Sequence, residues 1–186
     1  MDMATLPDIG LAGRMRVGKT TAAEYLRDHY GYTIIGFADP VRSAISALNP
    51  IVDQSGLRYR AAVDTYGYDG AKDQFPEVRR LLQNWGMTVR DHVSPDLWAN
   101  VLRGMVEKLD ADQPVVVPDV RFRNELQVLS ELGFVTARLT RATAPVQEHE
   151  SEGGLDDATV DYEYANNRTV GDLWGWLDFL VGAGTF

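Results

Sequence analysis

The chain has 186 residues, 45% of them hydrophobic, and its formal net charge is −9. The length predicts one domain with a full core, and the lack of cysteine excludes disulfides, thiolate metal sites and thiol nucleophiles. The acidic charge argues against nucleic acid as a partner, and the sequence has neither a signal-peptide pattern nor the ~18 consecutive apolar residues of a membrane span, so we expect a cytoplasmic protein with small-molecule ligands.

Segments with the apolar pattern of strands alternate along the chain with segments that have helical spacing. In chain order, the patterns predict a strand at 8–13, a helix at 18–30, a strand at 32–37, a helix at 39–50, an irregular or partly helical insert at 51–75, helices at 76–93 and 94–109, a strand at 114–120, a helix at 123–133, a strand at 134–141, a polar loop at 142–164, a short strand and a closing helix at 169–181. Ser94 is expected to cap the helix at 94–109, with Pro95 in its first position.

This alternation predicts an α/β fold, with a central parallel sheet and helices on both faces. In such sheets ligands bind at the carboxyl ends of the strands. Functional residues are therefore expected directly after the predicted strands.

The segment after the first predicted strand has the spacing Gly13-x-x-x-x-Gly18-Lys19-Thr20, followed by a helix. This is the pattern of a phosphate-binding loop, in which backbone N–H groups, the lysine and the helix N-terminus hold a nucleoside triphosphate. The alternative is an ordinary glycine-rich turn. The Thr20 hydroxyl is a candidate magnesium ligand. The residues expected to bind ATP here are Gly13, Arg14, Arg16, Val17, Gly18, Lys19, Thr20 and Thr21.

Asp119 closes the apolar run of the strand at 114–120, where an acid can orient magnesium or its waters. The alternative is that Asp119 caps the following helix. Pro118, directly before it, is unusual in a central strand.

The guanine-reading motif Asn-Lys-x-Asp of switch GTPases is absent from the sequence, and the chain is short for a motor or a helicase. A small phosphotransferase is the remaining class. Six segments support this class: GLAGRMRVGKTTAAEYL, GFADPVR, LLQNWGMTVRDHVSPDLWAN, VVVPDVRFRNE, HESE and NNRTVGDL. Together they resemble the bacteriophage deoxynucleoside monophosphate kinases, which are relatives of the phosphomevalonate and dephospho-CoA kinases.

The resemblance implies a single P-loop kinase domain over residues 1–186, with an acceptor-binding insert at about 50–95 and a lid loop at about 141–156. It implies transfer of the γ-phosphoryl group of ATP to a deoxynucleoside monophosphate, with Mg²⁺ as cofactor. It also favours a homodimer and, for a phage protein, location in the host cytoplasm.

On the acceptor side, Asp39 is expected at the end of the second strand, where it could orient or deprotonate the attacking group, hold a magnesium water, or only cap the next helix. Arg42, one turn further, could reach the acceptor phosphate or lie on a solvated helix surface. The resemblance places Arg90 at the acceptor phosphate. Gln83 and Trp85 are candidates for reading and stacking on the acceptor base, although Trp85, and Trp98 likewise, could instead belong to the core.

Around the transferred phosphoryl group, the Asp-Val-Arg pattern of the family favours Arg121 over Arg123 as the catalytic residue. Arg141, at the end of a predicted strand, has the position of a lid arginine, whereas Arg138 lies within that strand. The remaining candidates are His149 and Glu152, which could touch the substrate when the lid closes, and Asn166 and Asn167, which the family pattern places near the ATP adenine. Trp174 and Trp176 are expected to pack the last helix.

Two other functions fit the same residues. The first is a P-loop kinase for another small acceptor, such as phosphomevalonate or dephospho-CoA. The second is a regulatory module that binds ATP without an acceptor, against which the cluster Arg42, Arg90, Arg121 and Arg141 argues. The amide of Gln83 could pair with adenine N6 and N7, which favours dAMP as the acceptor.

Overall fold

The computed structural model describes residues 6–143, 155 and 157–183. The chain divides into two compact units, a core unit formed by Met1–Phe37 and Ala99–Phe186 and a helical unit formed by Ala38–Trp98. None of the helices within these described ranges combines the length and the apolar character that a membrane crossing requires.

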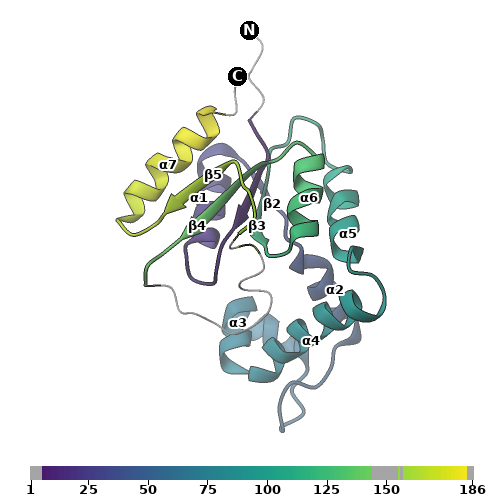
Figure 1. Cartoon of the computed structure of the whole chain (residues 1–186). Coiled ribbons are helices and arrows are strands. Elements are labelled where there is room, and N and C mark those ends of the chain that lie inside the picture. The colour runs from purple at the N-terminus through teal and green to yellow at the C-terminus, as the bar shows by residue number, and fades with distance from the viewer. Residues whose placement is uncertain (1–5, 144–154, 156, 184–186) are drawn as a thin grey trace. The chain divides into compact units, whose positions relative to one another are not determined.

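The core unit contains a five-stranded sheet in which every pair of neighbouring strands is parallel (Figure 1). The strand order is β2-β3-β1-β4-β5. The strands are β1 (Ile9–Ala12), β2 (Thr33–Ile34), β3 (Val115–Val120), β4 (Val135–Thr140) and β5 (Tyr162–Ala165). The chain moves from β3 to β4 across β1, so the order reverses at β1, which is where ligands of such sheets bind.

Helices cover both faces of the sheet (Figure 1). On one face α1 (Lys19–Tyr30) and α7 (Val170–Ala183) pack on Ile9 and Leu11 of β1. On the other, α5 (Leu97–Val106) and α6 (Arg123–Glu131) contribute Leu102 and Leu129 to a second core. Gly10 of β1 lets α6 approach closely, because a Cβ there would lie 2.6 Å from Leu129 Cδ1. The expected α/β fold is confirmed.

Pro118 is tolerated within β3 because neither of the strands beside β3 pairs with it at that residue. The last pair between β2 and β3 joins Ile34 to Val116, before the proline is reached. On the other side, the register between β1 and β3 shifts between Gly10 and Ala12, opposite this part of β3. A residue without an N–H is tolerated at such an irregularity.

Several predicted element boundaries were wrong, among them the end of the second strand and the start of the helix at 94–109. The strand expected at 32–37 pairs only at Thr33–Ile34, and the chain enters a helix at Ala38, so Asp39 lies in the first turn of that helix and not at the end of a strand. The helix expected from Ser94 begins at Leu97. Ser94 instead starts a turn, in which its Oγ accepts the N–H of Asp96 at 3.3 Å.

The helical unit contains α2 (Ala38–Leu48), α3 (Tyr59–Gln74) and α4 (Pro76–His92). Its own core includes Ile45, Tyr59 and Ala62. The segment expected to be an irregular or partly helical insert is largely the helix α3, which is kinked at Gly67 with φ 69° and ψ 178°. This glycine conformation rotates the following turn relative to the preceding one, so no single apolar face runs through the segment and its helical periodicity is weak.

Candidate active site

The predicted phosphate loop connects β1 to α1 and requires glycine at both ends. Gly13 has φ 133° and Gly18 has φ 108°, which disfavour other residues. A Cβ on Gly13 would lie 2.2 Å from Leu139 O, and one on Gly18 would lie 2.6 Å from Asn166 Nδ2. The two glycines therefore allow the loop to pack against the ends of β4 and β5.

Lys19 is the first residue of α1, and its side chain folds back over the loop. Its ammonium group donates to the carbonyl oxygen of Gly13 and to that of Arg14, the latter at 2.8 Å. Among the other predicted ATP-binding residues, Val17 is buried and anchors the loop in the core, whereas Arg16, Thr20 and Thr21 are exposed. The loop thus presents a cation at the start of a helix, an arrangement suited to a polyphosphate.

Asp119 lies near the carboxyl end of β3, as predicted. Its Oδ1 accepts the N–H of Phe37 at 2.9 Å. A Cβ on Gly36 would lie 2.8 Å from its Oδ2, so glycine makes room for the carboxylate. The N-cap of α6 is Phe122 and not Asp119, which rules out the capping alternative.

The residues predicted to hold magnesium are Thr20 and Asp119, a hydroxyl and a carboxylate. Hard oxygen donors of this kind fit Mg²⁺, which binds proteins through one or two such groups and otherwise keeps waters and substrate phosphates. Within the part of the chain that the structure describes, no group of three or more His, Cys, Asp or Glu side chains could hold a metal ion. A magnesium site of the kind expected here does not need one.

The two arginines after Asp119 have different surroundings. Arg123 is exposed and forms an ion pair with Asp157 at 2.5 Å. Arg121 is half-buried, and its backbone N–H donates to the buried carboxylate of Glu125 at 2.8 Å. This difference favours Arg121 as the one with a role in the site.

Two further arginines come from β4 and the residue after it. Arg138 is 11% exposed, pairs with Glu163 at 2.6 Å and donates to the carbonyl oxygens of Leu155 and Ala158. These contacts give it a structural role. Arg141 is exposed and its Nε donates to Asn166 O at 2.9 Å, which leaves the rest of its guanidinium to act elsewhere.

The segment that follows Arg141 is described only in part. His149 and Glu152 lie outside the described residues. Asn167, expected near the adenine, is exposed, and its Oδ1 accepts the N–H of Ala142 at 2.7 Å. Trp174 stacks on Tyr25 and Trp176 on Tyr164, in agreement with packing of the last helix.

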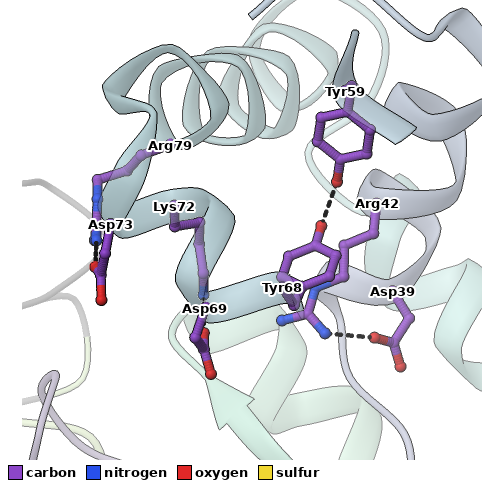
Figure 2. Close-up of polar contacts among 8 residues, drawn as sticks. All are labelled: Asp39, Arg42, Tyr59, Tyr68, Asp69, Lys72, Asp73 and Arg79. Atoms are coloured by element: carbon purple, nitrogen blue, oxygen red, sulfur yellow. Dashed lines mark hydrogen bonds and ion pairs between the residues drawn. The ribbon is translucent and has the colours of Figure 1, made fainter. Parts of the chain in front are cut away.

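In the helical unit, Arg42 is held on two sides (Figure 2). Its Nη1 pairs with Asp39 Oδ1 at 3.1 Å, and its guanidinium lies 4.2 Å from the ring centre of Tyr68. The Tyr68 hydroxyl in turn lies 2.6 Å from that of the buried Tyr59. Burial and this hydrogen bond raise the pKa of Tyr68 well above its ordinary value, so the ring stays neutral beneath the cation.

The ring of Tyr68 lies near a second cation, because Lys72 Nζ is 5.4 Å from its centre. Lys72 pairs with Asp69 at 2.6 Å and holds the pKa of that carboxyl below its usual range (Figure 2). A groove of about 510 Å³ between α2 and α3 opens beside Arg42 and Tyr68. Tyr68 was not among the residues predicted from the sequence, in which the preceding residue, Gly67, is the only local sign of the kink.

The acceptor candidates of α4 lie on different sides of the helix. Gln83 and Arg90 are seven residues apart, two turns, and share one face, whereas Trp85 points away from Gln83. Both Gln83 and Arg90 are half-buried, and Trp85 is 36% exposed. Trp98 is buried, packs with Val41 and Val89, and donates its ring N–H to Gly86 O at 3.0 Å, which favours the packing alternative for this tryptophan.

Comparisons with known proteins point to kinases. A protein of Acanthamoeba polyphaga mimivirus, named "Putative deoxynucleotide monophosphate kinase", is 30% identical over 188 residues, which cover 91% of this chain and 93% of that protein. The "Uncharacterized protein ORF76" of Ictalurid herpesvirus 1 (strain Auburn) is 30% identical over 174 residues, 90% of this chain and 64% of that protein. No protein-family model matches the chain.

Among solved structures, shikimate kinase from Acinetobacter baumannii in complex with shikimate superposes with a TM-score of 0.51. The match covers 98% of this chain and 97% of that one at 15% sequence identity. At this identity the similarity concerns the fold alone, and it agrees with the parallel sheet and flanking helices described above.

Proposed function

This chain belongs to the P-loop kinase family of its mimiviral relative, and from that premise we propose that it transfers the γ-phosphoryl group of ATP to a deoxynucleoside 5′-monophosphate. The observation that carries the acceptor class is the 30% identity to that relative over 93% of the relative's length. The phosphate loop and its lysine support ATP as the phosphoryl donor.

On the donor side, the backbone of the loop from Gly13 to Thr20 holds the phosphates, and Lys19 neutralises charge on the β- and γ-phosphates. A bound Mg²⁺ ion, held by Thr20 and Asp119, would neutralise further charge on the same groups. Arg141 and Arg121 stabilise the charge on the phosphoryl group during its transfer. In phosphoryl transfer of this kind, positioning and charge stabilisation provide most of the catalysis.

On the acceptor side, Arg42 and Arg90 bind the 5′-phosphate of the monophosphate. A guanidinium is suited to this because it donates two parallel hydrogen bonds to phosphate oxygens. Asp39 and Tyr68 support the proposal for Arg42, since they hold its guanidinium in one orientation. Asp39 thereby acts at least as a positioning group.

The proposal is tested by measuring ADP release from ATP and Mg²⁺ with a panel of deoxy- and ribonucleoside monophosphates, phosphomevalonate and dephospho-CoA. We expect one or more deoxynucleoside monophosphates to stimulate release, with dAMP among them. Stimulation only by phosphomevalonate or dephospho-CoA would replace the proposed acceptor class. No stimulation by any acceptor, with ATP still bound, would indicate a regulatory ATP-binding module.

The variant Arg141→Ala is expected to lower turnover by a factor of about 10² while changing ATP affinity only a few-fold, because a lid arginine acts mainly on charge that develops in the transition state. Turnover and the ATP dissociation constant are measured separately. Arg123→Ala, which removes an exposed arginine of the same unit, is the matched control and should resemble the wild type. Equal losses in affinity and turnover would instead indicate ordinary ground-state binding by Arg141.

Removing Arg90 and Gln83 should have different consequences, because all monophosphates share the phosphate but not the base. Arg90→Ala should raise KM for every accepted monophosphate by a similar factor, on the order of 10 to 100 for a lost charge-assisted bond. Gln83→Ala should change the ranking of the bases. Arg80→Ala, an exposed position of the same helix, serves as the control. An unchanged ranking, or an effect of Arg90→Ala on ATP instead of the acceptor, would contradict this acceptor site.

A further inference from the structure

Asn166 directly follows β5 and is buried, with 3% of its surface exposed. Its backbone is tied to the end of β4: its N–H donates to Thr140 O at 2.8 Å, and its carbonyl accepts the Nε–H of Arg141 at 2.9 Å. The residue is therefore held in place by contacts that do not involve its side chain.

The side chain of Asn166 reaches the phosphate loop. Its Nδ2 donates to Val17 O at 2.9 Å, and the same nitrogen would lie 2.6 Å from a Cβ on Gly18. A carbonyl oxygen can only accept hydrogen bonds, so the amide nitrogen of Asn166 must face it. The contact thus depends on a side-chain donor at position 166 and on glycine at position 18.

This contact orients one peptide group of the loop. The peptide that joins Val17 to Gly18 is trans, so its C=O and its N–H point in opposite directions. Because Asn166 binds the carbonyl, the N–H of Gly18 is directed away from Asn166. Backbone N–H groups at this end of a phosphate loop bind phosphate oxygens together with the helix N-terminus.

We propose that Asn166 is a positioning residue of the phosphate site: through Val17 O it sets the orientation of the Gly18 N–H that binds a phosphate of ATP. This inference rests on the proposed binding of ATP by the loop. It assigns Asn166 to the phosphates and not to the adenine, because the buried side chain donates to a carbonyl of the loop. The carbonyl of the same residue supports Arg141, so one residue holds both the loop and the proposed lid arginine.

The test compares ATP with tripolyphosphate, a probe that has the phosphates and lacks the nucleoside. Dissociation constants for both are measured by calorimetry with the wild type, Asn166→Ala, Asn166→Asp and, as a control at an exposed position of α5, Asn100→Ala. Asn166→Ala should weaken both ligands by the same factor, on the order of tenfold, because the buried Val17 carbonyl loses its donor. Asn166→Asp keeps the shape without the donor and adds a negative charge, so its loss should be at least as large. Asn100→Ala should leave the binding of both probes unchanged.

Thermal unfolding shows whether each variant is folded, and Asn166→Asp, which adds no cavity, provides the answer if Asn166→Ala does not fold. Wild-type affinity of a folded Asn166 variant for tripolyphosphate would overturn the inference, and a loss restricted to ATP would assign Asn166 to the nucleoside. These outcomes do not depend on which acceptor is phosphorylated. A wild-type protein that bound neither probe would overturn the proposed donor as well.

Discussion

Replacing Lys19 by alanine is expected to abolish phosphoryl transfer while leaving the fold intact. In the proposed mechanism the ammonium group neutralises charge on the β- and γ-phosphates, and removal of charge stabilisation of this kind costs a factor of ~10² or more in turnover. The fold should persist because the side chain donates to the carbonyl oxygens of Gly13 and Arg14 and takes no part in the hydrophobic core. Turnover is measured with saturating ATP and acceptor.

Lys108→Ala is the matched control, since Lys108 is an exposed lysine of the same unit. It should retain wild-type turnover, and both variants should unfold within a few degrees of the wild type. Retention of more than about a tenth of wild-type turnover by Lys19→Ala would contradict the assigned role. A large drop in the unfolding temperature would instead mean that the lysine is needed to hold the loop.

Replacing Asp119 by asparagine should lower turnover by a factor on the order of 10² and raise the Mg²⁺ concentration needed for half-maximal activity. Asparagine has nearly the same shape, and its carbonyl oxygen can still accept the N–H of Phe37, so the end of β3 should keep its structure. What it lacks is the negative charge to which we attribute binding of the metal ion. The measurement is a magnesium titration of turnover.

Asp112→Asn provides the comparison, because Asp112 is exposed and precedes β3, whereas Asp119 lies at the opposite, carboxyl end of the same strand. It should leave the magnesium titration unchanged. If Asp119→Asn also had wild-type turnover and the wild-type magnesium requirement, Asp119 would not be the metal-binding acid, and its contact with the N–H of Phe37 would indicate a structural role.

The phosphate loop could be recognised from the amino-acid sequence because everything it needs lies within a few consecutive residues. Gly13 and Gly18 provide the backbone conformations, Lys19 provides the cation, and the helix follows at once. The alternation of apolar patterns likewise predicted the parallel sheet with helices on both faces, because each strand or helix of this kind has a periodicity that can be read locally. Asp119 was placed correctly for the same reason, as the acid near the end of a continuous apolar run.

The contacts that link distant parts of the chain could not be obtained in this way. Asn166 and Val17 are 149 positions apart, and Arg42 is joined to Tyr68 through a helix kinked at Gly67. Asp39 was misplaced because the length of β2 depends on which residues pair with β3, and pairing stops at Ile34. Local patterns report which face of an element is apolar, whereas the partner of a side chain depends on the packing of whole elements.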